Sequence, residues 1–119
     1  MNAHEKINYV EFAAKDLGAT KEFFRKAFAW EFTDYGEDYT AFSGEGLDGG
    51  FYQADLATSA ERGGALIVFY SEGLEETLEK VKKAGAEITR EIFSFPGGRR
   101  FHFREPSGNE FAVWSDKGL

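Results

Sequence analysis

The feature that most constrains the fold of this sequence is a tight turn between two strand-like segments near its carboxyl end. The turn reads Glu105-Pro106-Ser107-Gly108-Asn109, in which proline presets the backbone and Gly108 supplies a left-handed position. Residues 99–104 and 109–115 flank the turn, and apolar side chains recur at alternate positions in both segments. This pattern predicts a hairpin that buries one row of side chains in a core. We expect functional residues in the row on the opposite face.

The first half of the chain reads as a strand, a helix and three short strands. Residues 7–14 alternate, which predicts a strand with Val10 and Phe12 on one face and Tyr9 and Glu11 on the other. The remaining predictions are a helix over 19–29 capped by Asp16, strands over 30–33, 39–42 and 50–53, and turn-rich segments over 34–38 and 43–49. Trp30, directly after the helix, is expected to pack against it.

The second half repeats this order after a polar linker over 54–63. Residues 64–70 form a continuous apolar run, which predicts a strand buried on both faces. A helix is predicted to begin near Leu74 and to end at Gly85. Three strands are then expected over 86–93, 99–104 and 109–115.

A weak internal repeat supports this division. Aligning residues 29–33 with residues 85–89 matches the two helix-to-strand junctions and superimposes Asp16 on Glu72. We therefore expect a single α+β domain over 1–119, built from two tandem βαβββ modules at about 5–56 and 63–116. Neither module is expected to be stable alone with an exposed sheet face.

Composition excludes several function classes. The net charge of −7 and the lack of a basic stripe argue against a nucleic-acid partner. No apolar run approaches the roughly 18 residues of a membrane span, and the first residues lack a signal-peptide pattern. There is no cysteine, hence no disulfide framework or thiolate metal site. We expect a soluble, cytoplasmic protein whose thirteen phenylalanines give an aromatic core.

The sequence resembles the vicinal-oxygen-chelate superfamily, which includes glyoxalase I, bleomycin-resistance proteins and extradiol dioxygenases. The resemblance extends from about Ile7 to about Ser115. The residues that carry it are Asp16-Leu17, Phe23-Phe24, Phe28-Ala29-Trp30, Ala84-Gly85-Ala86 and Glu105-Pro106-Ser107-Gly108-Asn109-Glu110. Glu105 departs from the family pattern, which usually has aspartate at that position. The resemblance implies two curved mixed sheets that form a cleft, but it specifies no single activity.

The metal-dependent members of that superfamily carry His, Gln or Glu ligands on the cleft strands. Matched residue by residue, these positions fall at Tyr9, at Leu66 within one residue, and at Ala112, and the fourth lies near Phe42 or Phe51. Leucine and alanine offer no lone pairs, and a neutral tyrosine is a poor ligand. We therefore predict no metal and no other cofactor.

Three polar residues are candidate catalytic groups. Glu11 and Glu110 share the cleft face with Tyr9 and Ala112, and His102 is the only histidine on a predicted strand. They can serve as acid and base in proton transfer, and the two carboxylates with the histidine could also make an oxygen-rich metal site. The alternative is that the two carboxylates lie at the rim, solvated or paired with the arginines of the 99–104 strand, Arg100 and Arg104, which share a face with His102.

The candidate ligand-binding residues lie on the same cleft face. Trp114, with Tyr9 and Tyr70, can form an aromatic wall for a planar ligand, or else belongs to the core or to a dimer interface. The full set is Tyr9, Leu66, Val68, Tyr70, Arg100, Ala112 and Trp114.

Two function classes follow from these residues. The first is a metal-independent small-molecule-binding protein that resembles bleomycin-resistance proteins. The second is a glyoxalase-like isomerase, lyase or hydrolase that acts on a small carbonyl or hydroxyl compound. Both imply a homodimer, because chains of the resembling family commonly complete each other's clefts. Convergence of Glu11 and Glu110 in one closed pocket would favour the enzyme.

Overall fold

The computed structural model describes residues 2–118 of the chain. The elements are, in order, β1 (Tyr9–Ala14), α1 (Leu17–Phe28), β2 (Phe32–Asp34), β3 (Tyr39–Glu45), β4 (Leu47–Gln53), β5 (Ile67–Tyr70), α2 (Leu74–Lys83), β6 (Glu87–Phe95), β7 (Gly98–Arg104) and β8 (Glu110–Ser115). The predicted order of a strand, a helix and three strands thus occurs twice.

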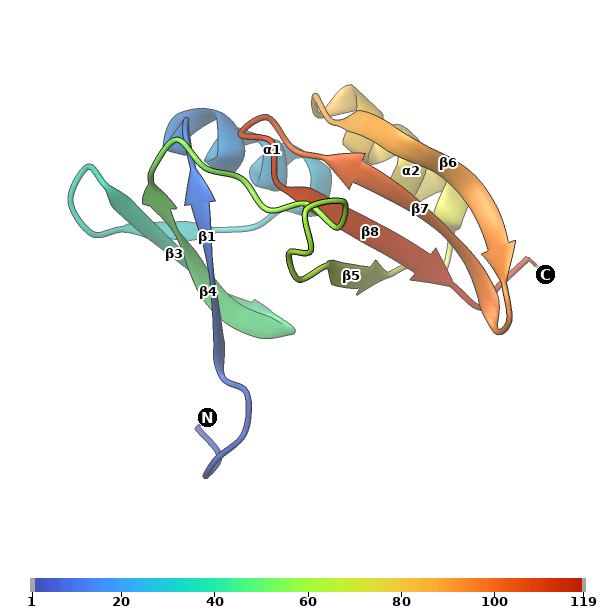
Figure 1. Ribbon diagram of the computed structural model, residues 1–119, viewed down its shortest axis with the longest axis horizontal. Helices are drawn as coiled ribbons and strands as arrows, with labels where there is room; N and C mark the ends of the chain where they lie inside the picture. Colours follow the sequence, from blue (N-terminus) through green and yellow to red (C-terminus); the bar gives the residue numbers. More distant parts are fainter. Residues whose placement is uncertain (1, 119) are drawn as a thin grey trace.

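The strands form two four-stranded mixed sheets with the same topology (Figure 1). The first has the order β1-β4-β3-β2 and the second β5-β8-β7-β6. In each, the strand before the helix pairs in parallel with the last strand of its half, and the other pairs are antiparallel. The predicted α+β fold of two tandem βαβββ modules is confirmed.

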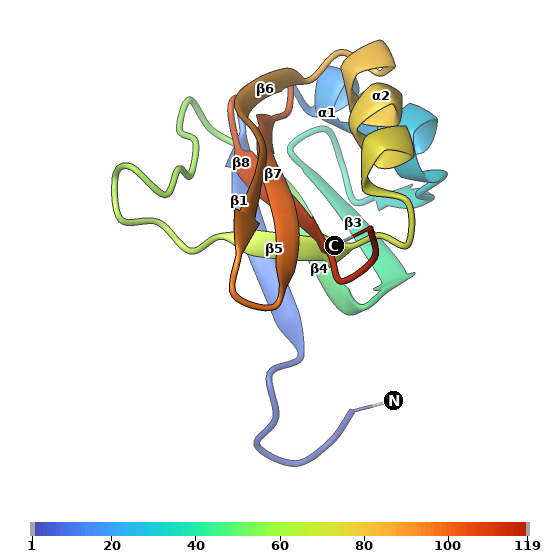
Figure 2. The same ribbon diagram turned by 90° about the vertical axis from the view of Figure 1, so that its right-hand side faces the viewer.

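The helices lie on one side of both sheets, and the linker over 54–66 lies on the other (Figure 2). Each sheet therefore has an inner face, which packs under the helices, and an outer face. As predicted, Phe12 is buried on the inner face, whereas Tyr9 and Glu11 lie exposed on the outer one. No helix within residues 2–118 has both the length and the apolar character that crossing a bilayer requires.

The aromatic core joins the two halves. Phe12 of β1 lies with its ring centroid 5.1 Å from that of Phe111 in β8, and Phe24 of α1 contacts Phe111 edge-on at 5.4 Å. Trp30 stacks on Phe24 at 4.4 Å, so its predicted packing against the first helix is confirmed. Because α1 contacts rings from both sheets, neither half has a complete core of its own.

The Glu105–Asn109 turn forms as predicted and also connects the halves. Gly108 has φ of +97°, and its N–H donates to the carbonyl of Glu105 at 2.7 Å. The side-chain amide of Asn109 donates to the carbonyl of Ala13 in β1 at 2.7 Å, and its oxygen accepts from the N–H of Thr58 at 2.9 Å. Thr20 of α1 donates to the buried Glu105 carboxylate at 2.7 Å.

Two element predictions were wrong in informative ways. Residues 43–49 were expected to be a turn, but β3 continues to Glu45 and β4 begins at Leu47, since Gly44 and Gly46 adopt positive φ in a short connection. The strand expected to be buried on both faces is β5, an edge strand whose Val68 and Tyr70 are 40% and 48% exposed. Apolar character alone does not distinguish a central strand from an edge strand.

The helix starts were predicted closely. The carboxylate of Asp16 accepts from the N–H of Ala19 at 3.0 Å, which confirms it as the N-cap, and α1 begins two residues before the predicted start because Leu17 and Gly18 complete its first turn. Helix α2 begins at Leu74 as predicted, and Gly85 follows its end with φ of +111°.

Candidate functional site

The outer face of the first sheet carries a small polar cluster. The hydroxyl of Tyr39 donates to Oε2 of Glu11 at 2.9 Å and lies 2.5 Å from the hydroxyl of Tyr9. Burial and the hydrogen bonds to these two residues raise the pKa of Tyr39. Glu11 is therefore held at an exposed position by a neutral phenol.

The outer face of the second sheet gathers most of the predicted ligand-binding residues. Register neighbours in a sheet point to the same side. One row across β5, β8, β7 and β6 is Val68, Ala112, His102 and Arg90, and the next is Tyr70, Trp114, Arg100 and Phe93. We call these eight residues, together with Phe95, the carboxy-terminal outer face.

The middle of the carboxy-terminal outer face is largely covered, and its margin is open. Ala112 is completely buried, whereas Val68 and Tyr70 on the edge strand are well exposed. The ring of Tyr70 meets that of Trp114 at 5.2 Å with an angle of 66°. Its hydroxyl donates to Asp116 at 2.5 Å, and this hydrogen bond raises the pKa of Tyr70 to about 12. The margin therefore offers an aromatic pair.

His102 of the carboxy-terminal outer face forms a buried pair with Glu110. Nδ1 of His102 lies 3.2 Å from Oε2 of Glu110, and Nε2 accepts from Nε of Arg100 at 3.2 Å. This arrangement requires the neutral tautomer that carries its proton on Nδ1. Burial lowers the pKa of His102, and the nearby Arg100 and Arg90 lower it further.

Glu110 is not solvated at the rim. It is 7% exposed, and its Oε1 accepts from the N–H of Ala60 in the linker at 2.8 Å. Burial opposes its ionisation, but the Ala60 N–H and His102 outweigh that effect and lower the pKa of Glu110. Neither Arg100 nor Arg104 pairs with it, since Arg104 contacts Glu87 at 3.3 Å.

The structure brings Glu110 and His102 together but leaves Glu11 apart from them. Within residues 2–118, Glu11 hydrogen-bonds to Tyr39 and Glu110 to His102, Thr89 and the linker, with no shared partner. The convergence that would favour an enzyme is therefore not found within one chain. Leu66 lies just before β5 and is half-buried.

The residues at the metal-ligand positions of the superfamily do not fit a metal ion. Tyr9 is hydrogen-bonded to another phenol, and Ala112 has no donor atom. Phe42 and Phe51, near which the fourth position was expected, belong to the core. Over residues 2–118 no three His, Cys, Asp or Glu side chains come close enough to share a cation. The donor set that metal-assisted chemistry requires is thus missing at these positions.

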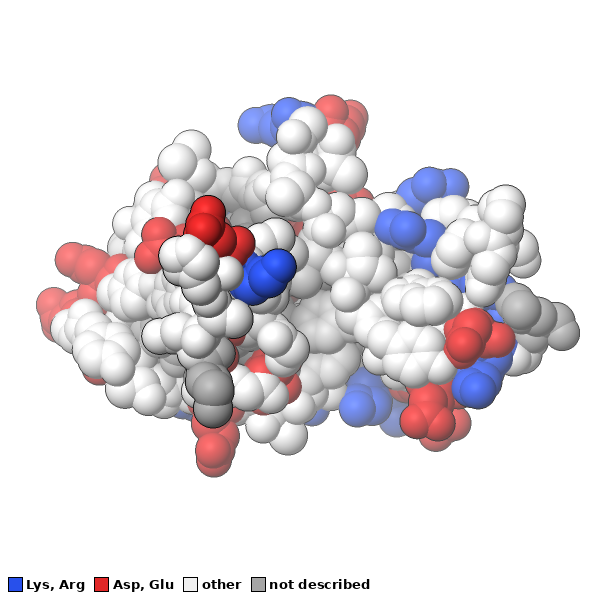
Figure 3. Space-filling model, turned by 90° about the horizontal axis from the view of Figure 1, so that it is seen from below, with Lys and Arg blue, Asp and Glu red and all other residues white. Residues whose placement is uncertain are grey.

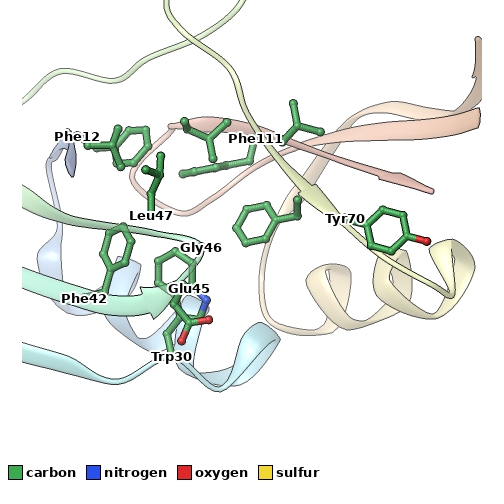
Figure 4. Close-up of a pocket in the computed structure, with 12 residues that line it drawn as sticks. Phe12, Trp30, Phe42, Glu45, Gly46, Leu47, Tyr70 and Phe111 are labelled. Carbon is green, nitrogen blue, oxygen red and sulfur yellow. The ribbon is translucent and has the colours of Figure 1, made fainter. Parts of the chain in front are cut away.

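A pocket of about 420 Å³ lies between the two halves (Figure 4). Its walls are mainly apolar, with Phe42, Glu45 and Trp30 on one side and Tyr70 on the other. Val68 also lines it, so the pocket reaches the margin of the carboxy-terminal outer face at β5. Burial raises the pKa of Glu45.

Arg90, Phe93 and Phe95 belong to the carboxy-terminal outer face but are not predicted from the sequence. The pairing of β6 with β7 shifts register on both sides of Arg90, once between Ile88 and Arg90 and once between Arg90 and Phe93. Simple alternation would place Arg90 and Phe93, three positions apart, on opposite faces. No signal in the sequence marks these irregularities, which bring both side chains to the outer face.

Comparison with known proteins identifies the family. The profile described as Glyoxalase/Bleomycin resistance protein/Dioxygenase superfamily matches residues 6–113. The chain therefore belongs to this superfamily, as its motifs suggested. A comparison with curated proteins gave no significant match.

Solved structures share the fold at low sequence identity. A glyoxalase-related enzyme from Fulvimarina pelagi has a TM-score of 0.78 at 13% identity, with 93% of this chain and 88% of that chain covered. Lactoylglutathione lyase from Agrobacterium tumefaciens has a TM-score of 0.70 at 18%, covering 99% and 100%. The fosfomycin resistance protein FosX from Listeria monocytogenes has a TM-score of 0.73 at 21%, covering 97% and 94%. These likenesses establish the fold and no particular activity.

Proposed function

We propose that this protein binds a small molecule on the carboxy-terminal outer face without using a metal ion, in the manner of bleomycin-resistance proteins. The observation that carries the proposal is the pair formed by the exposed Tyr70 and the half-buried Trp114, beside the fully buried Ala112. Ala112 stands where a metal-dependent relative has a ligand, so the face keeps aromatic contact area and lacks the metal donor. The adjoining apolar pocket between the halves supports the same proposal.

A fragment screen followed by NMR tests this proposal. The chain has two tryptophans, so the indole N–H signal of Trp114 reports on the carboxy-terminal outer face and that of Trp30 on the core. We expect bound fragments to shift the Trp114 signal and Trp114→Ala to weaken their binding. Tyr35→Ala, in the exposed loop before β3, is the control and should change nothing. Fragments that all bind elsewhere, with no response at Trp114, would contradict the proposal.

Metal analysis tests the proposal that this protein binds its ligand without a metal ion. Protein incubated with Zn²⁺, Ni²⁺, Fe²⁺ or Mn²⁺ and then desalted should retain only traces of each, because the available donors are too few. One tightly held metal per chain, lost in the Glu11→Gln or Glu110→Gln variant, would overturn it.

The alternative, an isomerase, lyase or hydrolase, is favoured by one observation. The buried contact of 3.2 Å between Glu110 and Nδ1 of His102 orients the imidazole as in a general base. Nε2 would act on substrate only after Arg100 leaves it. Carbonyl fragments that bind should then exchange their α-protons in D₂O with wild-type protein and not with His102→Gln. Equal exchange by both proteins would eliminate this function.

A further inference from the structure

Two guanidinium groups on the carboxy-terminal outer face have no acidic partner in the described part of the chain. Arg104 and Arg99 pair with Glu87 and Glu75, but neither Arg90 nor Arg100 forms an ion pair with any residue in 2–118. Seen from below, Figure 3 shows blue basic atoms over the second half, on the linker side.

Both guanidinium groups are held in place by aromatic rings. Cζ of Arg90 lies 3.9 Å from the ring centroid of Phe93, and Cζ of Arg100 lies 6.0 Å from Phe93 and 5.9 Å from Phe95. The ring of Phe95 in turn lies 6.3 Å from that of Trp114. The close ring contact of Arg90, and for Arg100 the hydrogen bond from Nε to His102, orient each guanidinium and leave its terminal nitrogens available for hydrogen bonds.

The positive charge of this surface comes from the two arginines and not from His102. Its Nε2 accepts from Nε of Arg100, so the imidazole is neutral and adds no charge. The terminal amino groups of Arg100 donate to no residue in 2–118, and the whole side chain of Arg90 is likewise without a hydrogen bond there. Terminal guanidinium nitrogens bind carboxylate and phosphate oxygens in pairs.

From this arrangement we infer that the ligand of the carboxy-terminal outer face is a planar organic anion. Its carboxylate binds the free edges of Arg100 and Arg90, and its flat body lies along Trp114 and Tyr70. The inference rests on the proposed function and adds the chemical class of the ligand to it. Two neighbouring cations without an acidic partner raise the local concentration of anions at this face.

Two probes that differ only in charge test the inference. Naphthalene-2-carboxylate and its neutral amide have the same planar body, and each is titrated into the protein while the Trp114 indole signal is followed. We expect the carboxylate to bind at least about tenfold more tightly than the amide, because charge-assisted hydrogen bonds are the stronger ones. Its affinity should fall as salt is added, while that of the amide should not change.

Variants that remove one positive charge test which arginines bind the carboxylate. Arg100→Gln and Arg90→Gln should each weaken carboxylate binding by about fivefold or more and leave amide binding unchanged. Arg104→Gln is the matched control, since Arg104 lies on the same strand and face as Arg100 but is already paired with Glu87. It should alter carboxylate affinity by less than about twofold, as is typical of an exposed, partnered charge.

The outcomes separate this inference from the proposed function. Equal binding of both probes at Trp114, unaffected by Arg100→Gln, would overturn the anion class while leaving small-molecule binding at this face intact. The absence of binding by either probe would also overturn it, and the fragment screen would then decide the proposed function independently. An equal loss for all three arginine variants would mean general attraction of anions and would contradict a defined site.

Discussion

At the scale of single residues, His102 is the most informative group in the molecule. It is 6% exposed and lies between a carboxylate and a guanidinium. Protonation would place a proton on Nε2, where Nε of Arg100 already donates, so the folded protein resists it. The lowered pKa of His102 thus has a structural cause that a measurement of stability can detect.

We predict that the free energy of unfolding falls as the pH drops below 6.5, the ordinary pKa of histidine. The unfolded chain takes up a proton in this range and the folded chain does not, so acid favours unfolding until the folded pKa is reached. Urea denaturation between about pH 7.5 and pH 5.5 should show this slope in wild-type protein and lose it in His102→Gln. Because the chain has only two histidines, both proteins should carry His4→Gln as well.

An unchanged slope in the His102→Gln variant would show that other groups cause the pH dependence. The histidine NMR signal of the His4→Gln protein is an independent check, and it should titrate below pH 6.5. Titration above that value would mean that the attraction of Glu110 outweighs burial and the two arginines.

At the scale of elements, the β7–β8 turn does more than reverse the chain. Asn109 is completely buried and spans three segments, with hydrogen bonds to Ala13 in β1, to Thr58 in the linker and to Glu105 in the turn itself. Burial raises the pKa of Glu105, while Thr20 and the turn N–H groups counteract that effect. The turn therefore sets how the second half docks on the first.

Replacing Asn109 with alanine should destabilise the protein by about 2–4 kcal/mol, because the Ala13 carbonyl and the Thr58 N–H would lose their partner in a buried place. Asn8→Ala is the matched control, since Asn8 is exposed and its side chain hydrogen-bonds only to Asn2 among residues 2–118. It should change the free energy of unfolding by less than about 0.5 kcal/mol. Urea denaturation compares the three proteins, and equal stabilities for Asn109→Ala and Asn8→Ala would show that the turn does not connect the halves.

The same elements show where sequence reasoning succeeds and where it stops. Alternation placed Tyr9 and Arg100 on outer faces correctly, because β1 and β7 follow a regular two-residue period. It could not place Phe93, because β6 departs from that period at two points that only its pairing with β7 reveals. Nor could it show that the linker covers Glu110, since the 2.8 Å contact with Ala60 joins residues fifty positions apart.

At the scale of the whole molecule, the two outer faces do not close on each other. Both sheets turn their outer faces away from the helices (Figure 2). Tyr9 on the first outer face and Tyr70 on the second are exposed to solvent. Each face exposes aromatic side chains, with Tyr52 39% exposed on the first sheet and Tyr70 48% on the second. A second copy, related by a two-fold axis, can place one kind of face against the other and complete two clefts at once.

We therefore predict a homodimer, with a mass in solution about twice the 13.3 kDa of the chain by light scattering after size exclusion. Tyr52→Asp should shift the equilibrium toward the monomer, because a charge in the centre of an apolar contact is costly to bury. Tyr35→Asp is the matched control, for this tyrosine is 64% exposed but lies in the loop before β3, away from the outer face. It should leave the mass unchanged. A monomer at every accessible concentration would mean that each outer face binds its ligand alone, and identical behaviour of the two aspartate variants would place the interface elsewhere.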